Sequence, residues 1–375
     1  MKSLLAKILS PFPDPAIAIE SAEFSRCVDL ARWHGLEALF YSRLKKNYAG
    51  LNACIDDYIR HNENIYLQNI AVSMQQEAVE KEVVATLGKH GIPACIIKGN
   101  EIARSLYGDP NCRSSADIDV LVKKADVIKS DKILRAAHYT ADEISLNYFL
   151  LHQQHAKYCD PVFKTLIELH WRFGIPYFFN LSSEQIWKEV FIGEGGYAKL
   201  SREMLIILLL IHHHNHSFSE LKILVDILWA FQKYEKDINW PEFSQKLKNI
   251  GLTKVAILSI SQIESLWPDD IYRILSLQSL KQLLAAMGCR VSKHLISYFR
   301  MNLNRVSALT IKDKIVGRFA LDGLGNMFIS YIKTILPPPV VIRELYHATG
   351  ALMLPVSYLR FIGWRVKVWR SYNKQ

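Results

Sequence analysis

The sequence predicts an α+β protein, in which a small core with a mixed sheet lies between N-terminal and C-terminal helical regions. The 375 residues, half of them hydrophobic, are enough for one large core or several smaller ones. Before residue 90 and again after residue 182, apolar residues recur at the three-and-four spacing of amphipathic helices. Between these regions, short apolar runs bounded by Gly and Pro are typical of buried strands.

On these grounds we divide the chain into four segments. An N-terminal helical region covers residues 1–90, and an α/β core covers 91–180. A helical domain that completes the cleft follows at 181–335, and a basic, aromatic C-terminal segment occupies 336–375.

Local sequence patterns predict the individual elements. In the N-terminal region, 66–87 contains many strong helix formers and neither Gly nor Pro. The elements expected in the core are a strand at 94–97, a helix at 100–107, a strand at 118–122, a helix at 124–137, and a hairpin of strands 155–159 and 165–171. Helices at 203–212 and 221–234 begin the next segment, and Pro337 to Pro339 interrupt the chain before a final helix.

The sequence favours a cytoplasmic protein. The longest apolar run, Met204 to Ile211, is far shorter than the roughly 18 residues of a membrane span. The six cysteines show no CxxC spacing, which favours reduced thiols over a disulfide framework or a zinc site.

The positive charge is concentrated near the C-terminus. The net charge is +10, and from Arg290 to Gln375 there are 14 Lys and Arg against 3 acidic residues. This stretch predicts a polyanionic partner, such as nucleic acid or an anionic membrane surface, and in the second case a peripheral membrane location. The alternative is a closing helix with tryptophans in the core and solvated arginines. The aromatic and cationic residues that alternate there are Tyr358, Arg360, Phe361, Trp364, Arg365, Lys367, Trp369 and Arg370.

Asp117-Ile118-Asp119 is the central chemical feature. Side chains alternate along a strand, so both aspartates project to the same side. Two carboxylates held together repel each other unless a cation lies between them, and hard oxygen ligands suit Mg²⁺. An Asp-x-Asp pair alone is weak support for a metal site.

Three neighbouring features strengthen the metal hypothesis. Glu168 places a third acid in an otherwise apolar strand, where it is costly unless paired or bound to metal. Lys98-Gly99 precedes a helix, whose N-terminal amides favour anions, and Arg113 could meet a triphosphate. Such a set serves in-line phosphoryl or nucleotidyl transfer. The alternative for Glu168 is a salt bridge with Arg172 or Lys157.

These residues carry a family resemblance. The stretch "CIIKGNEIARSLYGDPNCRSSADIDVLV" followed by "LIELHW" resembles the uncharacterised nucleotidyltransferase family of bacteria, within the DNA polymerase β-like superfamily. That family has an LKG strand end (IKG here), a Y-x-x-P-x-x-R stretch, a DID pair and an IELHW strand. The similarity extends outward to the "LARWHG" stretch from Leu30 and to an H-x-x-x-H…LKxLxD pattern at His212, His216, Lys222 and Asp226.

The resemblance implies a minimal nucleotidyltransferase core that uses Mg²⁺ (or Mn²⁺) to move a nucleoside monophosphate from an NTP to an acceptor. By position, Asp117, Asp119 and Glu168 would be the metal-binding and catalytic carboxylates. The phosphates would be held by Lys98, Gly99, Asn100 and Arg113. The wider superfamily has Gly-Ser where this chain has Gly99-Asn100, and a shorter spacing to the aspartates, so phosphate binding is less firmly implied than metal binding.

The flanking helices offer an acceptor pocket. His212 and His216 share a helical face, with Lys222 and Asp226 on the following helix, and His170 lies in the IELHW strand. We predict that these residues shape the acceptor pocket. A zinc site at the histidines is a weaker alternative, because no Glu follows the first His as in a metalloprotease.

Two other functions remain open. A nucleotide-sugar glycosyltransferase also uses Asp-x-Asp, but such enzymes precede it with a long alternating α/β half, whereas the first segment here is helical. A noncatalytic protein that binds nucleotide or a partner would most readily lose the three carboxylates, and all three are present. The acceptor and the base of the NTP are not encoded in any recognisable motif.

Overall fold

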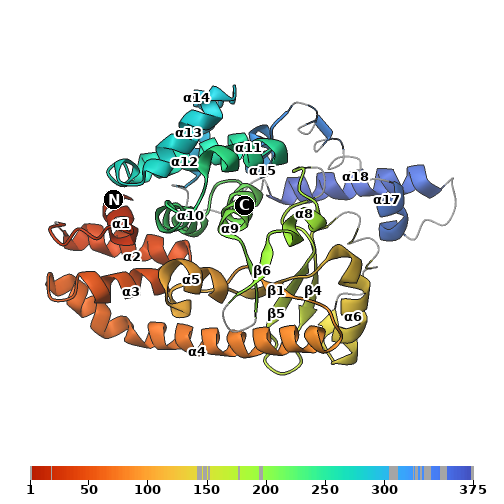
Figure 1. Ribbon diagram of the computed structural model, residues 1–375, viewed down its shortest axis with the longest axis horizontal. Helices are drawn as coiled ribbons and strands as arrows, with labels where there is room; N and C mark the ends of the chain where they lie inside the picture. The colour runs from red at the N-terminus through yellow and green to blue at the C-terminus, as the bar shows by residue number, and fades with distance from the viewer. Residues whose placement is uncertain are drawn as a thin grey trace.

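A computed structural model shows a central sheet enclosed by helices (Figure 1). It describes residues 2–17, 19–141, 153–175, 178–193, 197–303, 311–323, 339–346 and 353–372, together with positions 146, 150, 325, 328, 329 and 332. Side chains of residues 364–372 lie outside this description.

The sheet has seven strands in the order β3-β4-β5-β2-β1-β7-β6. It is mixed, because β5 pairs parallel with β2 and β1 pairs parallel with β7, while the other neighbours are antiparallel. The predicted α+β class, with a mixed sheet between helical regions, is confirmed. The strands are β1 (Cys95–Ile96), β2 (Asp117–Leu121), β3 (Thr140–Ala141), β4 (His155–Cys159), β5 (Leu166–His170), β6 (Val190–Ile192) and β7 (Ala198–Leu200).

The local predictions for the core agree closely with the structure. Helix α5 (Asn100–Tyr107) has the predicted bounds and is flanked by Gly99 and Gly108, both with positive φ, a conformation that glycine adopts without steric cost. The predicted hairpin is confirmed as β4 and β5, which pair antiparallel from His155 opposite His170 to Cys159 opposite Leu166.

Three strands were missed. β3 precedes the hairpin, and β6 and β7 lie beyond residue 182, where only helices were expected. Each has two or three residues, which is too short to show the period-two pattern of a strand. The expectation that the chain is helical after residue 182 is therefore wrong at β6 and β7.

The two faces of the sheet belong to different cores. On one face, apolar residues such as Val120 and Leu169 pack with Val83 of the long helix α4 (Ala53–Lys89), which runs beneath the strands in Figure 1. Side chains alternate along each strand, so Asp119 and Glu168 project to the opposite face. On that face lie α5, α9 (Arg202–Asn215) and α10 (Leu221–Lys233).

The N-terminal helices and the helices that follow the sheet share one hydrophobic core, whose residues run from Leu4 to Ala320. Two hydrogen bonds between residues far apart in the sequence cross this core. Trp229 Nε1 donates to the carbonyl oxygen of Leu9 at 3.0 Å, and Trp267 Nε1 donates to that of Ala6 at 2.7 Å. The helices not yet given are α1 (Lys2–Leu9), α2 (Ser21–Trp33), α3 (Glu37–Asn47), α6 (Val127–Ala136), α8 (Ser183–Trp187), α11 (Trp240–Ile250), α12 (Thr253–Leu266), α13 (Leu275–Ala286), α14 (Lys293–Asn302), α15 (Ile311–Gly317), α17 (Pro339–Tyr346) and α18 (Met353–Tyr372). The four-segment division of the chain stays a prediction.

The final helix was predicted and is present as α18. The predicted aromatic and cationic side chains from Trp364 onward lie outside the described residues. Among the helices that the structure describes, none combines the length and the apolar character that crossing a bilayer requires.

Candidate functional site

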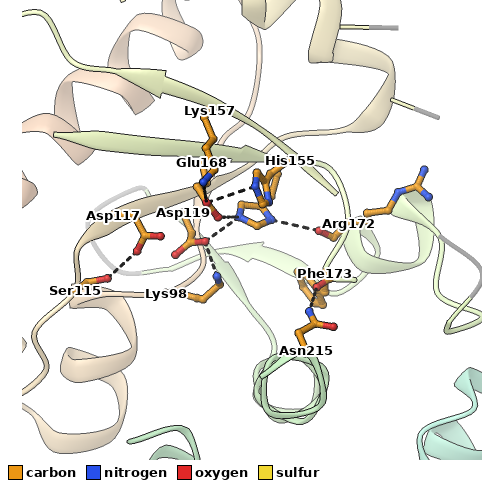
Figure 2. A network of polar contacts seen from close by, with 11 residues as sticks. Lys98, Ser115, Asp117, Asp119, His155, Lys157, Glu168, Arg172, Phe173 and Asn215 are labelled. Atoms are coloured by element: carbon orange, nitrogen blue, oxygen red, sulfur yellow. Dashed lines mark hydrogen bonds and ion pairs between the residues drawn. The ribbon is translucent and has the colours of Figure 1, made fainter. Parts of the chain in front are cut away.

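Three carboxylates meet on the sheet face opposite α4. Asp117 and Asp119 lie on β2, and the parallel register places Asp119 directly beside Glu168 on β5. One carboxylate oxygen from each of the three residues lies within 4.8 Å of the others. Figure 2 shows the three side chains at the centre of a polar network. The sequence predicted this group by residue type, and the register of two strands far apart in the chain brings it together.

Asp119 is the most deeply buried of the three, with 1% of its surface exposed. Its Oδ1 lies 2.5 Å from Lys98 Nζ and 2.8 Å from His170 Nε2 (Figure 2). Burial alone would raise the pKa of Asp119, but the positive charges of Lys98 and His170 outweigh burial and hold it well below its ordinary value. Asp119 is therefore an anion at neutral pH.

Asp117 lies in an environment that disfavours its ionised form. Its Oδ1 accepts a hydrogen bond from Ser115 Oγ at 3.1 Å. Burial and the negative charge of Asp119 raise its pKa above the ordinary value, and Lys98 opposes this only in part. A cation placed between Asp117 and Asp119 would relieve this repulsion.

Glu168 contacts two histidines and one lysine. Its Oε2 lies 3.3 Å from His170 Nε2, and its Oε1 lies 3.4 Å from His155 Nε2 and 3.5 Å from Lys157 Nζ. Burial raises the pKa of Glu168, but the hydrogen bond from His170 and the charge of His155 lower it to about 2. The salt bridge to Lys157 that was considered as an alternative thus exists beside the carboxylate cluster.

His155 was missed by the sequence analysis. Antiparallel pairing of β4 and β5 places it opposite His170, with ring centroids 4.9 Å apart. Together with Glu168 these histidines form a second group that could hold a metal ion. Burial and the neighbouring His170 lower the pKa of His155 to about 4, so its ring is neutral at pH 7 and can donate a lone pair. The predicted hairpin could have revealed it, since its register pairs 155 with 170.

The donor set fits a divalent ion. Three carboxylates supply hard oxygen ligands of the kind that Mg²⁺ and Mn²⁺ prefer. The buried Asp119 Oδ1 receives no aligned hydrogen bond from the described residues, although two cationic groups lie near it. His170 could also coordinate, because its Nε2 faces both Asp119 and Glu168.

Gly99 shapes the backbone next to Lys98. Its φ of +59° is one that side-chain-bearing residues rarely adopt, and a Cβ there would lie 3.6 Å from the Cβ of Ser115. The side chain of Asn100 is buried and engaged with Ser73, whose Oγ donates to it at 3.1 Å and whose carbonyl accepts from it at 3.1 Å. The positive φ therefore favours glycine at the start of α5, and Asn100 attaches α5 to α4.

Arg113 is buried in an ion pair. Its Nε donates to Asp226 Oδ2 at 2.9 Å, and Tyr107 donates its hydroxyl to Asp226 Oδ1 at 2.6 Å. Arg113 is 5% exposed and Asp226 is 0% exposed. These contacts connect the loop before Asp117 to α10.

The remaining candidates lie on α9 and α10. Burial, and after it the charge of Lys98, lower the pKa of His212 well below its ordinary value. His216 lies against His212 with ring centroids 4.6 Å apart, and its Nδ1 is 2.5 Å from Glu220 Oε1. Lys222 Nζ is 3.5 Å from the carbonyl oxygen of Ser114. Burial and the charge of Arg113 lower the pKa of Lys222.

The fold and this site define a class of protein: a mixed-sheet α+β protein with a three-carboxylate cluster suited to divalent metal. The sequence model of the family "Uncharacterised nucleotidyltransferase" matches residues 20–268, which is well over half of the chain. The protein belongs to this nucleotidyltransferase family. Neither the curated proteins nor the solved structures compared with it give a significant match.

Proposed function

We propose that the protein is a metal-dependent nucleotidyltransferase of the DNA polymerase β-like type, which moves a nucleoside monophosphate from an NTP to an acceptor. One observation carries this proposal: the β2–β5 register, which gathers oxygens of Asp117, Asp119 and Glu168 within 4.8 Å. Family membership supports the reaction class.

The three carboxylates would hold Mg²⁺ or Mn²⁺. When bound, such ions neutralise charge on the phosphates and polarise the phosphorus that is attacked. Glu168 would accept the proton of the attacking acceptor hydroxyl. The bond between the acceptor oxygen and the α-phosphorus forms as the bond to the bridging oxygen breaks, and pyrophosphate leaves with that electron pair. Asp119 stays ionised throughout because of its two cationic neighbours.

The phosphates would lie at the start of α5. Lys98 supplies a positive charge, and the conformation of Gly99 lets a phosphate approach the backbone. Direct contact by Arg113 or by the Asn100 side chain would require their buried pairs to open. We therefore assign them a positioning role in the predicted nucleotide site: Arg113 fixes the loop that leads into β2, and Asn100 fixes α5.

The acceptor would enter between the sheet and the helices α9 and α10. His212 and Lys222 would contact the acceptor. The 3.5 Å contact of Lys222 Nζ with the carbonyl oxygen of Ser114 supports this, because Ser114 lies in the loop that leads to Asp117. His216 would orient His212. Asp226 would act through Arg113, and His170 through Asp119 and Glu168.

A thermal shift titration tests the proposal. Mg²⁺ or Mn²⁺ and each of the four NTPs are added to the wild type and to an Asp117→Ala/Asp119→Ala variant. A ligand at about 100 times its Kd should stabilise the fold by about 2.7 kcal/mol. We expect one NTP to stabilise the wild type only with metal present, and the variant to show no such response. The selected NTP, with a labelled α-phosphate, then serves to screen acceptors.

A matched control is Asp57→Ala/Glu63→Ala, which removes two exposed acids of α4. It should respond as the wild type does. Lack of stabilisation by every NTP, or an equal response in the Asp117→Ala/Asp119→Ala variant, would contradict the proposal. Metal-dependent NTP binding without release of pyrophosphate, across the acceptor screen, would favour the noncatalytic alternative.

The basic stretch from Arg290 to Gln375 would bind a polyanion, either nucleic acid or an anionic membrane surface. Its net positive charge supports this, because 14 Lys and Arg stand against 3 acidic residues. A cytoplasmic location, peripheral to the membrane in the second case, stays a prediction. Cosedimentation with anionic vesicles and gel shift with RNA, both at low salt, distinguish the two partners.

A further inference from the structure

A cavity lies on the α4 side of the sheet, away from the carboxylates. It has a volume of about 240 Å³ and is enclosed by α4, β1, α5 and β7. Its apolar wall consists of Val84, Ala94 and Ile96, and Tyr197, 44% exposed, borders it. Ala94 packs in the core between the sheet and α4, whereas Asp119 projects from the opposite face. The sheet therefore separates the cavity from Asp119.

Most charges of this cavity are already compensated. Lys81 pairs with Glu77 at 2.8 Å. Glu101 pairs with Arg104 at 3.2 Å and with Lys199 at 3.1 Å. Each of the three basic side chains in the wall therefore has an acidic partner.

Glu80 is the exception. It lines the cavity and is only 7% exposed, on the face of α4 that packs against the sheet. Among the described residues none forms a hydrogen bond or an ion pair with its carboxyl group. Burial raises the pKa of Glu80 to about 8, and Arg104 opposes this only in part. Buried polar groups normally have partners, so an unpartnered carboxyl at a cavity wall indicates a ligand.

We propose that this cavity binds a small primary amine with an apolar body, whose ammonium group pairs with Glu80. The raised pKa leaves most of the unliganded Glu80 protonated at neutral pH. A bound ammonium would favour the ionised form, because it supplies the opposite charge and hydrogen-bond donors. The apolar body would lie against Val84, Ala94 and Ile96, and an aromatic ring at the mouth, that of Tyr197, suits a cationic or aromatic ligand. The volume is below the roughly 300 Å³ at which pockets for drug-sized ligands begin, so the ligand is small.

Calorimetric titration with 2-phenylethylamine tests the proposal on the metal-free protein of 375 residues. Phenylacetate and 2-phenylethanol have the same body with a negative or no charge. We expect saturable binding of the amine and weaker or no binding of the other two. Glu80→Gln should weaken amine binding at least about tenfold, which corresponds to about 1.4 kcal/mol.

The controls separate this site from the carboxylate cluster. Glu63→Gln removes an exposed acid from the same helix and should bind the amine as the wild type does. The Asp117→Ala/Asp119→Ala variant should also bind it normally, whether or not the proposed transferase activity exists. Val84→Phe fills part of the cavity and should abolish binding even if Glu80→Gln does not fold. Absence of saturable amine binding, equal binding by Glu80→Gln and wild type, or preference for phenylacetate would overturn the proposal.

Discussion

Two buried aspartates, Asp226 and Asp119, differ in how completely their charge is compensated. Asp226 uses one oxygen for Arg113 and the other for the Tyr107 hydroxyl, so both of its oxygens have partners. Asp119 directs a single oxygen at Lys98 and His170 and lies beside two further carboxylates. The first is a closed pair that holds α10 to the loop before β2. The second leaves surplus negative charge, which a metal ion can neutralise.

The largest expected effect comes from breaking the closed pair. Arg113→Ala leaves Asp226 buried without a counter-charge, which should lower the free energy of unfolding by about 3–5 kcal/mol. Urea unfolding of the metal-free protein measures this. The double variant Arg113→Met/Asp226→Leu removes both charges and should regain most of the loss. A single variant as stable as the wild type would show that the pair is not structural.

A smaller effect is expected at the three-carboxylate cluster, where a substitution should lower the affinity for a metal ion. Asp117→Asn removes one negatively charged ligand. Loss of a residue that only orients a metal ligand weakens binding by roughly 10- to 100-fold, so the affinity for Mn²⁺ should fall by at least this much. The metal-free variant should be as stable as the wild type or more so, because burial and Asp119 already disfavour the charge of Asp117. Calorimetry with Mn²⁺ and urea unfolding measure the two quantities. Unchanged Mn²⁺ affinity would remove Asp117 from the metal site.

The third prediction concerns acid unfolding. The pKa of Glu168 is lowered from its ordinary 4.5 to about 2 in the fold. Its ionised form therefore stabilises the metal-free protein above about pH 4.5, and this contribution is lost as the pH falls toward 2. Glu168→Gln lacks this ionised group, so the stability advantage of the wild type, about 3 kcal/mol at neutral pH, should shrink over that range. An advantage independent of pH would contradict this. The exposed Glu63→Gln should follow the wild type throughout.

The sequence identified the three carboxylates from local patterns, although it is the pairing of β2 with β5 that brings Glu168 beside Asp119. Asp117 and Asp119 share a strand face by alternation, and Glu168 stands out in an apolar strand. The bounds of α5 followed from Gly99 and Gly108, and those of β4 from its own apolar pattern.

What the sequence did not predict depends on partners far along the chain. Arg113 and Asp226 are separated by 113 positions, and nothing local shows that they pair. His155 becomes part of the cluster only through cross-strand register. Asn100 has its partner, Ser73, on another helix. The short strands β6 and β7 gain their stability from the sheet edge that they extend, since three residues have little preference of their own.

The shared helical core also constrains how the chain can fold. The carbonyls of Ala6 and Leu9 meet their tryptophan partners only after a further 261 and 220 residues have been synthesised. Helix α1 can therefore form these two hydrogen bonds only after the chain has been synthesised as far as α10 and the end of α12. Closing so long a loop lowers the conformational entropy of the chain before the stabilising contacts form. The segment that forms the sheet thus lies in the chain between two sets of helices that pack against each other. A single proteolytic cut in its surface loops would leave two fragments that remain associated.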